Sequence, residues 1–234
     1  MTENIKTRLE GRQGIFYVLL GILVFGSIWG LLEATLGGFL NLILFPNKGA
    51  IMAGIGVAIM ASALAIYKKP SMLLGIGVVA ASFKWFNAWL LFVPLNAIQV
   101  VNPAMAIIFE SFAFALVAAF LMNRMEKKVL VGVGAGALAG FVGAVAWVYF
   151  AIYVLNAPAY ARVVFTAGEY ISNQAVIQAV FMGLFAPLGY LAGTKLAAKT
   201  FPALTKKMPL YYASTVATIV ICWGVSAIAF VSGL

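Results

Sequence analysis

Three ionisable residues stand alone inside long apolar stretches of the sequence: Glu33, Lys84 and Glu110. A charge at the centre of a bilayer costs about 2.5–3.5 kcal/mol on insertion scales, so such residues usually pair with one another or serve a function. Counted from the expected helix starts, all three lie at a similar depth. We expect a Glu–Lys–Glu cluster that lines a polar cavity. The alternative is that the lysine and one glutamate neutralise each other and only fix packing.

Amide and aromatic side chains accompany these charges. Such groups suit an organic ligand with a flat ring and polar substituents, and two glutamates against one lysine slightly favour a cationic or amine-bearing ligand. The expected ligand contacts are Glu33, Lys84, Trp85, Trp89, Glu110, Trp147, Asn173 and Gln174. Further amides at the same depth or in nearby connections are Asn41, Asn87, Asn96, Gln99, Asn102 and Gln178.

The residue inventory excludes several classes of site. The chain has no histidine and no aspartate, and Cys222 is its one cysteine. A histidine-ligated haem, a His/Cys zinc cluster, a Ser–His–Asp triad and an internal disulfide therefore cannot form within this chain. A phosphate-binding GxxxxGK[ST] loop is also missing from the sequence. We expect a protein that is not an enzyme and that uses no cofactor or metal.

The elements that would position these residues are membrane helices. Of the 234 residues, 65% are hydrophobic and 9% charged, and the mean hydropathy is +1.08. Because a spanning helix needs about 20 apolar residues, we predict an all-α, polytopic membrane bundle of six to seven helices in a single domain, residues 1–234. The predicted spans are Gly14–Phe45, Gly49–Tyr67, Ser71–Pro94, Pro103–Asn123, Val129–Leu155, Ser172–Thr194 and Leu210–Val231. The first is too long for one straight crossing, so we expect it to tilt or to break near Gly37-Gly38 and run along the outer surface to Pro46.

The basic residues predict the orientation. With seven crossings, 12 of the 15 lysines and arginines fall on one side, before the first span or after spans two, four and six. The other side receives Lys48 and Arg162. The positive-inside rule then places the N-terminal segment 1–13 and a basic loop at 195–209 in the cytoplasm, and the C-terminus outside. The net charge of +9 thus reflects topology in a lipid environment and does not indicate a nucleic-acid partner.

Two other features allow more than one interpretation. Small residues recur at intervals of four, which lets helix backbones approach closely; they are Gly26, Gly30, Ala34, Gly132, Gly136 and Gly140. They could serve internal packing or the interface with a partner subunit. The connection from Asn156 to Ile171 could be a lid over the cavity or a surface turn.

The chain resembles the substrate-binding membrane subunits (S components) of energy-coupling-factor (ECF) vitamin transporters. The likeness lies in its size, in the segment from Gly26 to Glu33 with the following Gly37-Gly38, and in the expected outward-facing polar pocket. Gly26-x-x-x-Gly30-x-x-x-Ala34 is similar in kind to the Ala-x-x-x-Ala pattern with which that family meets its transmembrane coupling protein. The resemblance covers 14–194, a six-helix core, and leaves the helix at 210–234 as an addition.

This resemblance implies a prokaryotic plasma-membrane protein that captures a small vitamin-like molecule from outside. ATP hydrolysis by partner ATPase subunits, joined through a transmembrane coupling protein, would drive release inward. Two other functions remain open from the sequence. One is a membrane-anchor or assembly subunit without a small-molecule site, and the other is a proton-coupled transporter in which Glu33 or Glu110 titrates.

Overall fold

The computed structural model describes residues 12–155, 167–206 and 208–233, and within these ranges it is all-helical. The N-terminal segment 1–11 and most of the expected lid, 156–166, lie outside the described residues. The helices are α2 (Arg12–Ala34), α3 (Leu36–Leu42), α4 (Lys48–Tyr67), α5 (Met72–Leu90), α6 (Ile98–Met125), α7 (Val129–Tyr153), α9 (Ala167–Tyr170), the π-helical turn η1 (Ile171–Ala175), α10 (Val176–Lys206) and α11 (Met208–Val231).

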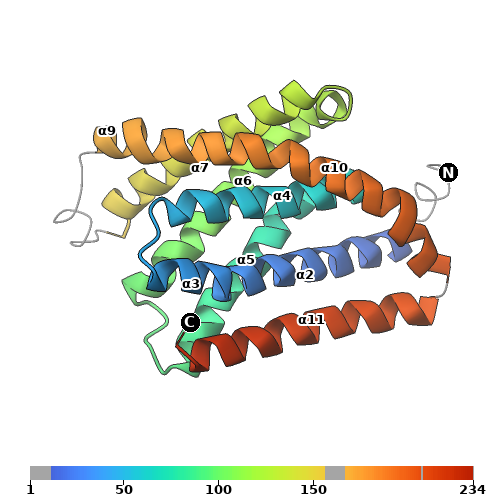
Figure 1. Ribbon diagram of the computed structural model, residues 1–234, viewed down its shortest axis with the longest axis horizontal. Helices are drawn as coiled ribbons and strands as arrows, with labels where there is room; N and C mark the ends of the chain where they lie inside the picture. The colour runs from blue at the N-terminus through green and yellow to red at the C-terminus, as the bar shows by residue number, and fades with distance from the viewer. Residues whose placement is uncertain (1–11, 156–166, 207, 234) are drawn as a thin grey trace.

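Seven helical stretches in the described part of the chain are long and apolar enough to cross a membrane. In Figure 1, α2, α4, α10 and α11 run roughly along the long axis of the molecule, and α5, α6 and α7 cross it obliquely. Large apolar side chains such as Phe112, Phe120 and Leu130 lie exposed on their outer faces, as expected where a bundle meets lipid. The predicted all-α membrane bundle is confirmed, and the seventh helix, α11, has the length and hydropathy of a span.

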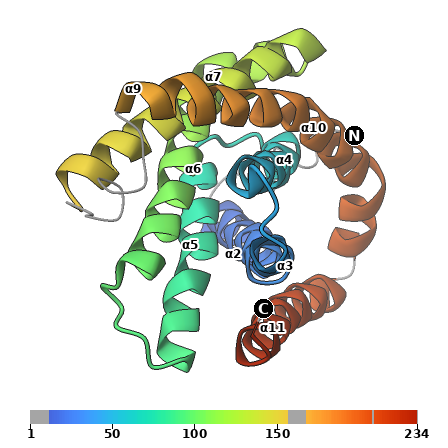
Figure 2. The same cartoon turned by 60° about the vertical axis from the view of Figure 1, so that its left-hand side comes forward.

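Six of the spans form a ring with α4 at its most enclosed position. Around the ring α2 packs on α5, α5 on α6, α6 on α7, α7 on α10, and α10 on α4. Contacts between α4 and α2 close the ring. In α4, 72% of the apolar stretch is buried, against 28% in α11. The last helix lies outside the ring and packs mainly on α2 (Figure 2). There Trp223 donates a hydrogen bond to Ser27 Oγ at 3.2 Å and its ring lies 4.2 Å from that of Phe83.

The first span, Gly14–Leu42, is interrupted by one turn residue, Thr35, two residues before the glycine pair near which a break was one of our two expectations. The Thr35 hydroxyl donates to the carbonyl oxygen of Leu31 at 2.8 Å, and its φ of −91° and ψ of −70° lie at the edge of the right-handed helical region. A hydroxyl bonded to the carbonyl four residues earlier competes with the helix ladder and bends it. The bend separates α2 from α3, so Glu33 and Asn41 lie on either side of it.

Two other helix boundaries differ from the predictions. α6 begins at Ile98 instead of Pro103, and the proline is accommodated inside the helix. α10 continues to Lys206, so most of the predicted basic loop at 195–209 is helical. The wrong boundary arose because Lys195 and Lys199 were read as the start of a connection, although lysine is a good helix former and can extend toward water at the end of a span.

The glycine stripes face other helices of the same chain. A Cβ atom on Gly26 would lie 2.5 Å from Val79, and one on Gly30 would lie 2.3 Å from Phe83. On α7, a Cβ on Gly136 would lie 2.3 Å from the Met182 carbonyl oxygen, and one on Gly140 would lie 3.0 Å from Ala179. Gly132 faces Pro187 at 3.5 Å, and Ala34 is buried. These small residues therefore serve the packing of helices within this chain, which was one of the two expectations, the other being an interface with a partner subunit.

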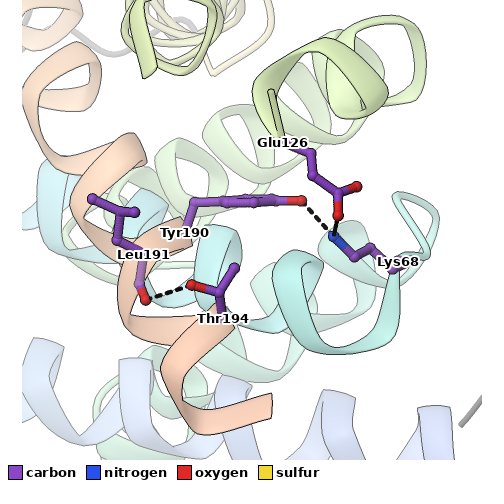
Figure 3. Close-up of polar contacts among 5 residues, drawn as sticks. All are labelled: Lys68, Glu126, Tyr190, Leu191 and Thr194. Atoms are coloured by element: carbon purple, nitrogen blue, oxygen red, sulfur yellow. Dashed lines mark hydrogen bonds and ion pairs between the residues drawn. The ribbon is translucent and has the colours of Figure 1, made fainter. Parts of the chain in front are cut away.

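A polar cluster ties three helices together at the end of the bundle where α4 ends and α7 begins. Lys68 Nζ lies 3.1 Å from Glu126 Oε1 and donates a hydrogen bond to Tyr190 Oη at 2.6 Å (Figure 3). Partial burial lowers the pKa of the Lys68 ammonium, but the acceptors Tyr190 and Glu126 outweigh that effect and hold the pKa above its ordinary value. On the next turn of α10, Thr194 bonds to Leu191. This cluster lies outside the predicted ligand contacts.

Candidate functional site

A cavity of about 490 Å³ lies between α2, α3, α4, α5 and α6. Exposed residues at its mouth come from the end of α3, the start of α4 and the start of α6, where the helices meet their connections; they are Asn41, Lys48, Gly49 and Gln99. Deeper walls are formed by Glu33, Met52, Ala53, Lys84, Ile107 and Glu110. The volume falls within the range of small-molecule sites, about 300–1,000 Å³.

The three intramembrane charges all line this cavity. Lys84 Nζ lies 3.0 Å from Glu33 Oε2, so α5 and α2 are joined by an ion pair whose side chains are 17% and 12% exposed. This residual exposure shows that the pair borders the cavity and is not sealed in the helix packing. Gly30 lies three residues before Glu33 and contacts Phe83, the residue before Lys84, so α2 and α5 are close together where the ion pair forms.

Glu110 has a different environment from Glu33. Its Oε1 accepts a hydrogen bond from Gln178 Nε2 at 3.1 Å. Within the described residues no lysine or arginine nitrogen lies within 4.0 Å of its carboxylate. Its backbone faces Gly143 of α7, where a Cβ would lie 3.2 Å from the Glu110 Cα. The close approach of α7 and the amide from α10 thus hold Glu110 at the cavity wall.

Amide side chains supply most of the remaining polar lining. At the mouth, Lys48 Nζ donates to Asn41 Oδ1. Farther in, the side-chain oxygens of Asn87 and Asn102 are buried and have no hydrogen-bond partner. Buried polar atoms are normally satisfied, so such an oxygen calls for a local explanation. Amide-bearing residues thus line the cavity, although the oxygens of Asn87 and Asn102 are themselves covered in this conformation.

The structure places the other five predicted contacts outside the cavity lining. Trp85 is half-buried against the main apolar core, and Trp89 is 65% exposed and stacks on Phe86. The Trp147 indole donates to the carbonyl oxygen of Asn102 at 3.4 Å, which joins α7 to α6 beside the cavity. The side chain of Asn173 donates to the Glu169 carbonyl in the first turns before α10. The half-buried Gln174 belongs to the same π-helical turn and does not line the cavity.

Several lining residues were missed or left in the background by the sequence prediction. Met52, Ala53, Ile107 and Phe230 form apolar walls, and nothing in their local sequence distinguishes them from core residues. Gln178 was noted as polar but not as the partner of Glu110. The spacing Glu33–Gly37–Asn41, at intervals of four, was the available signal for one wall of the cavity, and all three residues line it.

The described residues contain no cluster of three or more His, Cys, Asp or Glu side chains that could hold a metal ion. The site offers two carboxylates, one paired ammonium and several amides in a half-enclosed space. Such a set can bind and orient a polar molecule by charge and hydrogen bonding. No family model, no curated protein and no solved structure matches this chain.

Proposed function

We propose that this membrane protein captures a small polar organic molecule from outside the cell, as the binding subunit of an uptake system. The observation that carries the proposal is the cavity of about 490 Å³ in which Glu33, Lys84 and Glu110 converge. Ionisable residues inside a membrane are costly, so a group that borders a cavity is better explained by a ligand pathway than by packing.

The distribution of charge orients the cavity outward. Described basic residues gather at the end of the bundle away from the mouth: Lys68, Lys69, Arg124, Lys127, Lys128, Lys195, Lys199 and Lys206. Lys48 is the described basic residue at the mouth. By the positive-inside rule the crowded end is cytoplasmic, so the mouth and the end of α11 face the exterior.

The resemblance to the S components of ECF transporters supports an uptake role that relies on partner ATPase subunits and a transmembrane coupling protein. The described cavity is enclosed on its inner side by buried side chains such as Ile107 and Ala53. Delivery to the cytoplasm would therefore require a change in helix packing, which a partner subunit could drive. The glycines that we expected at this interface pack internally, so the coupling surface would be a different one.

A cavity-filling variant tests the proposal. A Cβ on Gly37 would meet Glu33 Oε2 at 3.6 Å and Met52 Cε at 3.7 Å, which are ordinary contacts, so Gly37→Leu can fit while its remaining carbon atoms fill the cavity. Gly134→Leu is the matched control, because Gly134 is exposed and a Cβ there meets nothing within 4 Å. Native mass spectrometry after exposure to an extract of polar metabolites should show a bound small molecule on the wild type and on Gly134→Leu. Gly37→Leu should show none.

The same experiment separates the other two functions. An anchor or assembly subunit would retain a partner protein and no small molecule, in all three forms. A proton-coupled transporter would give uptake driven by a pH gradient in vesicles that contain this chain alone. A small molecule that binds equally to Gly37→Leu would show that the cavity is not its site.

A further inference from the structure

The arrangement of acceptors in the cavity bears on the chemistry of its occupant. We propose that the cavity takes an organic cation, whose ammonium or amidinium group binds Glu110 while its other donors bind Asn87 and Asn102. This inference rests on the proposed function, because it assigns a chemical class to the ligand of the same cavity.

Glu33 and Lys84 neutralise each other. Their charged atoms lie 3.0 Å apart, and both side chains are largely removed from solvent. Coulomb attraction is several-fold stronger at such a site than in water. A ligand that took either partner would leave the other charge uncompensated. The pair therefore contributes no net charge for recognition and leaves Glu110 as the acidic group of the deep cavity.

Glu110 can accept from a ligand cation. Gln178 contributes one neutral hydrogen bond to its Oε1, and a carboxylate has about four acceptor sites on its two oxygens. A positively charged ligand group would be attracted to the Glu110 carboxylate, whereas an anionic group would be repelled by it. The charge arrangement thus favours a cation and disfavours an anion.

The two asparagines add directional acceptors. The Asn87 and Asn102 side-chain oxygens are buried, lack partners in the structure, and belong to residues that line the cavity. A buried oxygen without a hydrogen bond is unfavourable, so a ligand donor that met either oxygen after rotation of the side-chain amide would remove that penalty. The Trp29 indole nitrogen is also buried without a partner, but it belongs to the core beside Gly56 and does not line the cavity.

A matched set of three probes tests this chemistry. The probes are phenethylamine, 2-phenylethanol and 3-phenylpropanoate, which share a ring and a short chain and differ in charge. Isothermal titration of the detergent-purified full chain at pH 7 gives their dissociation constants. We expect the amine to bind at least tenfold more tightly than the alcohol, a difference of about 1.4 kcal/mol, because a hydrogen bond between charged groups is stronger than one to a neutral hydroxyl. The anion should bind most weakly.

Glu110→Gln removes the charge with little change in volume and should abolish the preference for the amine. Glu126→Gln is the matched control, because Glu126 lies in the Lys68 cluster at the other end of the bundle. Glu110→Asp keeps the charge and should keep a preference for the amine at reduced affinity. The wild-type ranking of the three probes does not depend on any variant, so it tests the inference even if a substitution impairs folding.

The inference is overturned if the alcohol or the anion binds as tightly as the amine, if no probe binds, or if Glu110→Gln leaves the preference intact. The experiments distinguish a wrong ligand class from a wrong binding site. If the alcohol or the anion binds the wild type and its binding is lost in Gly37→Leu, the proposed function stands and only the assignment of an organic cation as the ligand is wrong. Retention of every bound molecule by Gly37→Leu would remove the cavity itself as a site.

Discussion

At the scale of single residues, the central feature is the unequal environment of the three intramembrane charges. Glu33 and Lys84 form an ion pair, whereas the Glu110 carboxylate accepts a hydrogen bond from the side-chain amide of Gln178. Sequence reasoning assigned all three to one cluster, and the structure brings them to one cavity. The sequence could not show that Glu33 pairs with Lys84 and Glu110 does not, because the pairing depends on which helix faces Lys84.

The ion pair can be tested by a double-mutant cycle. Lys84→Met leaves the Glu33 carboxylate without its partner and should lower the free energy of unfolding by about 3 kcal/mol, as for other buried pairs that lose one member. Glu33→Gln combined with Lys84→Met removes both charges and should cost less than the sum of the single changes. Reversible unfolding of the purified variants in detergent measures these differences. Strict additivity would mean that the two side chains do not interact in the folded protein.

At the scale of helices, close contacts at small residues set the geometry of the bundle. Gly189 and Gly193 of α10 approach the backbone of α4 so closely that a Cβ would lie 2.1 Å and 2.4 Å from carbonyl oxygens. Ser62 reinforces the contact with a hydrogen bond to the Gly189 carbonyl at 2.7 Å. In lipid, such close packing replaces the hydrophobic driving force that holds soluble helices together. These contacts place the helices that carry the cavity walls.

Two glycines two residues apart on α7 provide a test with an internal control. At Gly136 a Cβ would lie 2.3 Å from the Met182 carbonyl oxygen, so Gly136→Ala must push α7 away from α10. It should lower the free energy of unfolding by about 1–3 kcal/mol, the usual cost of overpacking. Gly134→Ala meets nothing within 4 Å and should be neutral or stabilising, because alanine has the higher helix propensity.

Both glycine variants can be compared by thermal unfolding in the same detergent. Equal loss of stability at the two positions would argue against the α7–α10 contact, since a general effect of a methyl group on the helix would act at both. A selective loss at Gly136 would support it.

At the scale of the whole molecule, the seven helices that are long and apolar enough to cross a membrane put their connections into two sets at opposite ends of the bundle (Figure 1). One end carries most of the described basic residues and the Lys68 cluster, and the other carries the mouth of the cavity. This separation of charge and cavity is the physical basis for proposing capture from outside and release inward. It also makes the orientation measurable.

Single cysteines at the two ends of α6 would report that orientation. In a Cys222→Ala background, Asn96→Cys should react with a membrane-impermeant maleimide on intact cells, because Asn96 is exposed at the cavity end. Lys127→Cys is exposed at the basic end and should react only after the membrane is permeabilised. The inverse result would reverse the proposed orientation. Labelling of both positions from one side would contradict a crossing by α6.

The sequence by itself determined the seven apolar spans and the asymmetry of basic residues, because length, hydropathy and charge are local properties of a segment. It also identified Glu33, Lys84 and Glu110 as unusual, since a charge inside an apolar run needs no tertiary information to be recognised. Local signals were weaker at helix ends, where Pro103 was read as a start and Lys195 as an end.

Only the tertiary structure decided which side of each helix faces the cavity. Trp85 and Trp89 belong to the same helix as Lys84 and Asn87, yet the tryptophans point away from the cavity that the lysine and asparagine line. The rotation of a helix about its axis depends on contacts such as Gly30 with Phe83, which join residues far apart in the sequence. In a chain that is apolar on almost every face, the hydrophobic pattern does not encode that rotation, and backbone approach at small residues does.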